Sequence, residues 1–252
     1  MVTREAWLTK LFNTYLAGPG NALLGLLAPL RSAFHQTAAN PKEPWADFIV
    51  MEILVAILLI AVLFVLRGSL SVNKPGKLQH IFELIHEFIG GQAEEQVGHD
   101  GHHHIVIFMT LFLFILFANL IGIIPGFVSP TQSHYVTAGC ALIAFLYYNL
   151  VGLKKNGLWK YTKHFFGPIP ALAPLMFPIE IISHLARPLS LTVRLFANMY
   201  AGEKVMLTFL GLTYLVVPAL FMGLHVFVAL LQAYIFVLLT MIYVAGAVAE
   251  EH

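Results

Sequence analysis

The chain has 252 residues, of which 59% are hydrophobic and only 11% are charged, and its formal net charge is +1. Ordinary soluble domains carry about 25% charged residues, so the composition excludes a soluble globular domain, and the near-neutral charge gives no indication of a nucleic-acid partner. The single cysteine, Cys140, excludes an internal disulfide framework. Several apolar runs exceed the roughly 18 residues that mark a membrane span. We therefore expect an all-α polytopic membrane protein.

Residues 1–45 form a mixed N-terminal segment that precedes the first long apolar run. The stretch "WLTKLFNTYLAG" has apolar residues at helical spacing, and "GPGN" at 18–21 interrupts it. We predict an external or interfacial helix followed by a loop in this segment, and a membrane domain over residues 46–252.

The first predicted span covers 48–66 and ends at Arg67. Residues 77–97 follow with an apolar stripe on one side and polar residues on the other, which predicts an amphipathic helix lying on the membrane or against a neighbour. The next two spans cover about 105–124 and 135–153, the first closed by a Pro-Gly pair and the second by a Lys-Lys pair.

The rest of the chain is apolar with scattered polar residues and is too long for one crossing. As a single helix it would run over about 110 Å, against a hydrocarbon core of about 30 Å. The turn is marked by Pro218, with Gly211 preceding it in the chain. We predict two long, strongly tilted helices, about 172–210 and 216–248, packed as a hairpin, which gives about five membrane helices in total.

Loop charges predict the orientation. Basic residues follow the first and third spans, whereas the loops at 125–134 and 211–217 contain no Lys or Arg. Because basic loops stay on the cytoplasmic side, we predict an external N-terminus and a cytoplasmic C-terminus. The four basic residues within 1–45 oppose this orientation, and we give more weight to the short loops that flank spans directly.

The predicted helix 172–210 carries a polar stripe. Its members follow one another at steps of three or four residues, which places them on one helical face. They are Glu180, Ser183, His184, Arg187, Ser190, Arg194 and Asn198. Arg194 stands deep in the apolar segment, where a charge is costly and usually functional. Glu203 falls about half a turn out of phase and should face elsewhere.

Folding the hairpin about residues 213–214 brings the isolated polar groups of the two helices to the same depth. Gln232 comes opposite Arg194, and His225 comes opposite Glu203. Arginine keeps its proton, whereas glutamate and histidine can exchange protons. A fixed cation beside titratable groups favours controlled proton movement, and a structural arginine paired with a carboxylate is the alternative.

The stretch "LSLTVRLFANMYAGE", residues 189–203, closely resembles the signature of the subunit a family of F-type rotary ATP synthases. "ANLIGIIPGFVSPT" at 118–131 is similar to the family's Asn-Leu-x-Gly-x-x-Pro segment, and "LLQAYIFVLLTMIYVAGAVAEEH" at 230–252 is similar to its C-terminal helix. The resemblance covers about residues 48–252 and implies the membrane stator beside a rotating c-ring.

The resemblance also implies residue roles. Arg194 would be the essential stator arginine that faces the c-ring carboxylate. The positions that match the external half-channel and the ring-facing surface are Asn198, Glu203, His225 and Gln232. The positions near the cytoplasmic half-channel are Glu180 and Ser183, and Asn119 matches the asparagine of the second span.

By the same resemblance the partners are the c-ring, the peripheral stalk subunit b, the lipid bilayer and protons, in the bacterial cytoplasmic (inner) membrane. The family implies no cofactor, no metal, no nucleic acid and no nucleotide chemistry in this subunit. The sequence leaves the choice between H⁺ and Na⁺ open, because the main ion ligands would belong to the c-ring.

Three features depart from the family pattern or from the stripe. Lys204 stands where an apolar residue is expected. "GHDGHHH" at 98–104 is unusually rich in histidine, and we expect a solvated loop rather than a metal site there. Arg187 is nearer the basic loop than Arg194, so we expect a structural role for it.

Other functions are compatible with several membrane spans. A secondary transporter would also place charges at mid-membrane, but it should show an internal repeat, and we find none. A membrane haem protein would use His184 and His225, the histidines well inside apolar helix. A structural scaffold would leave the depth-matched polar groups unexplained.

Overall fold

Long α-helices form almost all of the chain that the computed structural model describes, which comprises residues 7–26, 44–71, 75–98, 100–124, 126–164, 173–212 and 216–248. In chain order the elements are α1 (Trp7–Tyr15), α2 (Ala17–Leu26), α4 (Asp47–Ser69), α5 (Lys77–Val97), α6 (Gly101–Ile121), the 3-10 helix η1 (Pro130–Gln132), α7 (His134–His164), α8 (Ala173–Leu212) and α9 (Val216–Val248). A positive φ of 71° at Gly157 interrupts α7 after its apolar part.

Four of the described helices are long and apolar enough to cross a membrane: α4, α6, α7 over His134–Lys155, and α9 over Val217–Val248. The composition-based prediction of an all-α polytopic membrane fold is thereby confirmed. The outer side of α4 is strongly apolar, with Ile60 64% and Phe64 77% exposed, which suits contact with lipid chains. α8 has the length for a span, but its polar stripe lowers its hydropathy, so its place in the bilayer remains a prediction.

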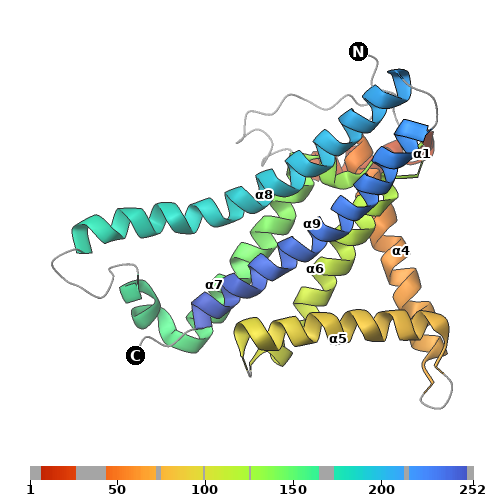
Figure 1. Ribbon diagram of the computed structural model, residues 1–252. Helices are drawn as coiled ribbons and strands as arrows, with labels where there is room; N and C mark the ends of the chain where they lie inside the picture. The colour runs from red at the N-terminus through yellow and green to blue at the C-terminus, as the bar shows by residue number, and fades with distance from the viewer. Residues whose placement is uncertain are drawn as a thin grey trace.

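The helices cross one another in two directions (Figure 1). α4, α6 and α7 run steeply between the two ends of the molecule, and α5 lies across one of these ends. α8 and α9 run obliquely over the steep helices, and α9 packs against α5, α6, α7 and α8. The end of α9 lies on the same side as α5, whereas α1, η1, the end of α8 and the start of α9 lie on the opposite side.

The last two helices have the length that the sequence predicts. α8 has 40 residues and α9 has 33, which correspond to about 60 Å and about 50 Å of helix. Each is far longer than the roughly 30 Å that an upright span needs, and their oblique course in Figure 1 accommodates the excess. Residues 213–215, where we predicted the fold-back, lie outside the described residues, and Pro218 occupies the first turn of α9, where its missing N–H has no intrahelical partner.

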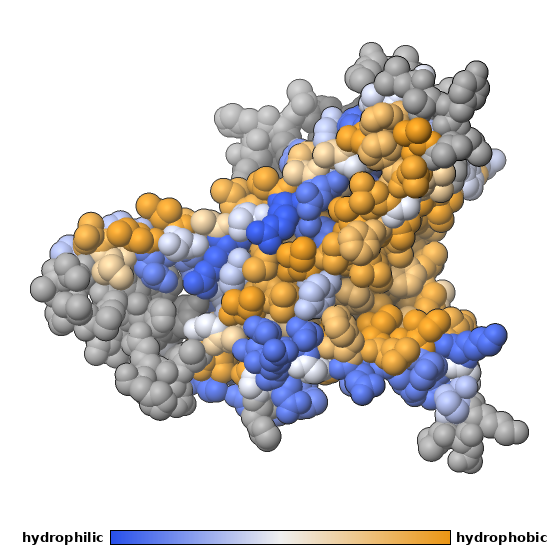
Figure 2. Space-filling view, viewed as in Figure 1, coloured by the Kyte–Doolittle hydropathy of each residue, from blue (hydrophilic) through white to orange (hydrophobic). Residues whose placement is uncertain are grey.

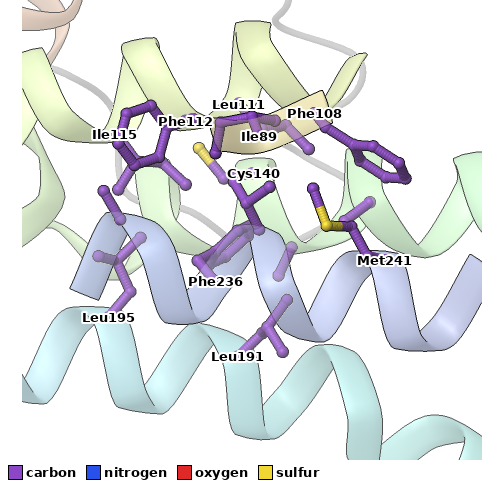
Figure 3. Packing of buried hydrophobic residues seen from close by; sticks show 14 of the residues in the cluster. Ile89, Phe108, Leu111, Phe112, Ile115, Cys140, Leu191, Leu195, Phe236 and Met241 are labelled. Carbon is purple, nitrogen blue, oxygen red and sulfur yellow. The ribbon is translucent and has the colours of Figure 1, made fainter. Parts of the chain in front are cut away.

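One apolar core joins α9 to α5, α6, α7 and α8, and Figure 3 shows part of it. Small residues such as Ala229 and Ala233 are fully buried and let neighbouring backbones approach closely. Around them pack Ile89 of α5, Phe108, Leu111, Phe112 and Ile115 of α6, Cys140 of α7, Leu191 and Leu195 of α8, and Phe236 and Met241 of α9. This core fixes the position of the α8–α9 hairpin on the rest of the subunit.

The N-terminal segment differs from the expected helix and loop. The chain bends only at Leu16, and "GPGN" lies inside α2 instead of opening a loop. Pro19 stands in the first turn of α2, where a helix tolerates proline. A residue outside these two helices stabilises the bend: the Trp45 ring nitrogen donates a hydrogen bond to the carbonyl oxygen of Leu16 at 2.8 Å. The predicted loop at 18–21 was therefore wrong.

The histidine-rich loop is also shorter than expected. α6 begins at Gly101, so His102, His103 and His104 form its first turn. A glycine is required at this corner, because a Cβ on Gly101 would lie 2.7 Å from the carbonyl carbon of Ala93 in α5. The close approach of the two helices leaves little chain for a loop, and His104 Nδ1 lies 2.7 Å from the Tyr147 hydroxyl in α7.

Candidate functional site

Contacts between α8 and α9 set the register of the hairpin. Asn198 Nδ2 donates to Gln232 Oε1 at 2.6 Å. One turn further along α8, Gly202 packs on the buried ring of His225, where an added Cβ would lie 2.7 Å from Cε1. Both contacts agree with the predicted antiparallel register to within about one helical turn. The hairpin therefore brings Asn198, Gln232 and His225 together.

The two long faces of α8 have opposite character. Leu191, Leu195 and Met199 are buried against the core, whereas Arg194 and Asn198 are exposed. Figure 2 shows a hydrophilic band along the middle of α8, bordered by hydrophobic surface. Within the part of the chain that the structure describes, Arg194 forms no ion pair. The guanidinium group is thus open to the surface of the described part of the chain.

Glu203 lies beside the Gly202–His225 contact and is half-buried. Its Oε2 atom is buried and has no hydrogen-bond partner among the described residues, and the same holds for Gln232 Nε2. The Lys204 ammonium group lies 5.2 Å from the centre of the Tyr200 ring, so it is held by an aromatic face. Because Lys204 is held at Tyr200 and Oε2 has no hydrogen-bond partner among the described residues, the carboxylate of Glu203 keeps an oxygen that can accept a proton.

The polar residues nearer the start of α8 are placed differently. Glu180 is half-buried and Ser183 is exposed. His184 Nε2 lies 2.9 Å from Asn149 Oδ1 and 3.4 Å from the Tyr148 hydroxyl, so His184 is tied to α7. Asn149 was not predicted as part of this group, although an amide within the apolar run of α7 was a visible signal.

Arg187 is distinguished from Arg194 by its surroundings. Its guanidinium carbon lies 5.3 Å from the centre of the Tyr243 ring and 6.0 Å from that of Tyr148. Arginine over aromatic faces is a stabilising arrangement. It links α8 to α7 and α9, and this agrees with the structural role expected from sequence. The two tyrosines escaped the sequence-based prediction because aromatic residues are common throughout these helices.

Asn119 is fully buried in a polar network outside the α8–α9 interface. Its Oδ1 accepts from Thr131 Oγ1 at 2.7 Å, and its Nδ2 donates to the carbonyl oxygen of Ala229 at 3.2 Å. Ser129 Oγ lies 2.6 Å from Thr131 Oγ1 and extends the network. These bonds join α6, the η1 turn and α9. They bring Asn119 to the backbone of α9 and not to a predicted site residue of α8.

The fold and the site define a class of protein: a helical, polytopic membrane protein whose last two helices form an overlong hairpin with an exposed arginine on its outer face. Comparison with known proteins gives the family. Residues 49–245 match the family model described as ATP synthase A chain. The chain belongs to this family, subunit a of the F-type ATP synthases.

Relatives named ATP synthase subunit a are similar in sequence over 84% to 98% of the chain. The chain is 59% identical to ATP synthase subunit a of Solibacter usitatus over 242 residues, which cover 96% of this chain and all of the relative. It is 46% identical to ATP synthase subunit a of Koribacter versatilis over 248 residues, 98% of each chain. It is 43% identical to the subunit a of Geobacter sulfurreducens over 211 residues, 84% of this chain and 91% of the relative. The family membership favours a membrane-sector subunit of an ATP synthase over the secondary-transporter and haem alternatives.

Proposed function

We propose that this chain is the proton-translocating stator of the ATP synthase membrane sector, and that Arg194 faces a carboxylate of the c-ring. One observation carries the proposal: Arg194 is exposed on the outer face of α8 and unpaired within the described residues, while the opposite face packs into the core. An arginine at mid-membrane costs from about 3 to over 10 kcal/mol. A carboxylate on an adjoining subunit would compensate that cost.

Protons would reach the ring from the external side along the hairpin. Glu203 and His225 lie at one contact of α8 with α9, and Asn198 and Gln232 form the next. The free oxygen of Glu203 and the imidazole of His225 can pass a proton towards a c-ring carboxylate. Once protonated, that carboxyl group is neutral and can face lipid at low cost, whereas the ionised form cannot.

After nearly a full rotation the carboxyl group would release its proton near Glu180 and Ser183, on the cytoplasmic side. The resulting anion is attracted to Arg194, whose fixed charge also separates the two half-channels. Each proton that crosses about 100 mV supplies about 2.3 kcal/mol, so several protons are needed for one ATP. The subunit has no nucleotide chemistry of its own, and the peripheral stalk subunit b would hold it against rotation.

We infer the orientation from the loop charges and from the side on which each helix ends. α5 and the end of α9 lie on one side of the molecule, and α1 and η1 lie on the other. With the basic loops inside, the first side is cytoplasmic and the N-terminal segment is external. The membrane would be the bacterial cytoplasmic (inner) membrane.

The experiment replaces Arg194 by glutamine and compares it with Arg187→Gln, a matched change on the same helix. ATP-driven proton pumping is measured in inverted membrane vesicles after assembly of the complex has been verified. Arg194→Gln should abolish pumping, and Arg194→Lys should fail too because a desolvated lysine can lose its proton. Arg187→Gln should still pump. An assembled Arg194→Gln complex that pumps normally refutes the assignment, and pumping that requires Na⁺ refutes the choice of the proton.

A further inference from the structure

A cavity of about 700 Å³ opens where the first turn of α6, the end of the apolar part of α7 and the end of α9 meet. It lies away from the hairpin contacts of Asn198 and His225. Its lining includes ionisable side chains, which we call the rim (Asp100, His103, Lys154 and Lys155), and apolar side chains, which we call the floor (Leu150, Val151 and Val248). The cavity therefore combines cationic groups with an apolar surface.

The charges on the rim leave one lysine available. Lys155 Nζ donates to Asp100 Oδ2 at 2.8 Å, and this bond and the lysine charge lower the pKa of the Asp100 carboxyl. Lys155 and Asp100 thus largely neutralise each other. Lys154 is exposed and has no ion pair with any residue that the structure describes. The rim consequently offers an uncompensated positive charge at Lys154, with His103 beside it.

The floor of the cavity reaches into membrane-spanning helix. Leu150 belongs to the apolar part of α7, which ends at Lys155, and Val248 ends the apolar part of α9. Leu150 is 64% exposed, so apolar surface lies open directly beneath the charged rim. Figure 2 shows the same change, with hydrophilic surface gathered near the end of α9 and hydrophobic surface next to it. A small soluble anion would contact the rim alone, whereas an amphiphile would cover both surfaces.

We propose that this cavity binds one anionic glycerophospholipid, whose phosphate contacts Lys154 and His103 and whose acyl chain covers Leu150 and Val248. Basic pockets between membrane helices on the cytoplasmic side suit such headgroups. The orientation derived above places the cavity on that side. The inference does not depend on the role of Arg194, because none of the hairpin residues lines the cavity.

The test measures lipid retention by the whole purified complex. The complex is exchanged into mixed micelles of phosphatidylglycerol and phosphatidylcholine, and lipid bound to subunit a is quantified by native mass spectrometry. Lys154→Gln should lower phosphatidylglycerol retention about fivefold, the change that one lysine near an anionic headgroup predicts. Lys154→Arg should restore it. Lys77→Gln is the matched control, because Lys77 is exposed at the start of α5 on the same side and does not line the cavity.

Two further arms separate the possible ligands. Inorganic phosphate at millimolar concentration should not displace phosphatidylglycerol, and Leu150→Ser should weaken retention of the lipid because it removes floor contacts. Displacement by inorganic phosphate would show a soluble-anion site and overturn the proposal. Equal retention in Lys154→Gln and Lys77→Gln would also overturn it, since the lysine would then serve another partner, such as the two glutamates that follow Val248 in the sequence.

Discussion

Replacing Gly202 by alanine tests the packing that holds His225 in the hairpin. The added Cβ would lie 2.7 Å from His225 Cε1, whereas ordinary contact begins at 3.4 Å. The imidazole ring must therefore move by at least about 0.7 Å, and further at Nδ1, which lies closer still to the added Cβ, or the helices must separate. The ring is only 6% exposed and has little room to yield. Overpacking of this kind costs about 1–3 kcal/mol, which exceeds the gain of up to about 1 kcal/mol from replacing a helical glycine by alanine.

The assay compares Gly202→Ala with Gly223→Ala in the intact complex. A Cβ on Gly223 meets nothing within 4 Å, so this control makes the same change in the same hairpin without an overlap. Gly202→Ala should lower the thermal denaturation temperature and the rate of ATP-driven proton pumping. Gly223→Ala should leave pumping unchanged and the denaturation temperature equal or higher.

A double variant separates packing from proton transfer. In Gly202→Ala/His225→Ala the ring that the new Cβ strikes is gone, so the denaturation temperature should recover relative to Gly202→Ala. Pumping should stay low, because the titratable group has been removed. Equal stability and equal pumping of Gly202→Ala and Gly223→Ala would show that α8 does not press on His225, and the argument from the register would be wrong.

Three shorter predictions concern the surroundings of the hairpin. Asn119→Leu should lower the denaturation temperature by a loss of about 1–3 kcal/mol, because Thr131 loses the acceptor Asn119 Oδ1 and the Ala229 carbonyl oxygen loses its side-chain donor; an unchanged temperature would contradict the network. Arg187→Gln should cost about 1 kcal/mol of stability as seen in the same melting assay, and a variant as stable as the wild type would show that the tyrosine contacts contribute nothing. Lys155→Gln should raise the pKa of Asp100 towards its ordinary value, as followed by carboxyl NMR. The native pKa of Asp100 is lowered, so the stability that this pair contributes is present above the unfolded-state pKa of about 3.9 and is lost as the pH falls through the native pKa. A stability difference between the wild type and Lys155→Gln that persists in stronger acid would contradict this.

Periodicity predicted the parts of the fold that depend on one helix or on one hairpin. The amphipathic stripe predicted the helix at 77–97, and α5 occupies the same residues. The hairpin register could be predicted because two helices joined by a short turn must pack antiparallel, and this fixes which depths coincide. The contact of Gly202 with His225 follows from that constraint.

Features that depend on a third helix could not be predicted. His184 meets Asn149 of α7 and Arg187 meets Tyr243 of α9, and nothing in local spacing tells which helices flank α8. The early start of α6 at Gly101 has the same origin, because it depends on close approach to α5. In each case the contact depends on how whole helices pack against one another, so local residue spacing does not predict it.

The geometry of α8 explains how the Arg194 cation can be held in place although it forms no ion pair with any residue that the structure describes. Leu195 is fully buried beside Arg194, so rotation of α8 about its axis would pull an apolar side chain out of the core. Asn198, one turn from Arg194, is bonded to Gln232 of α9 and opposes the same rotation. The contacts of Leu195 and Asn198 thus set the direction in which Arg194 leaves the helix, and the outward face of α8 stays open. The role proposed above for Arg194 would need this combination, since the charge would have to keep its position while successive acid groups moved past it, and a strong bond within the subunit would prevent it from attracting them.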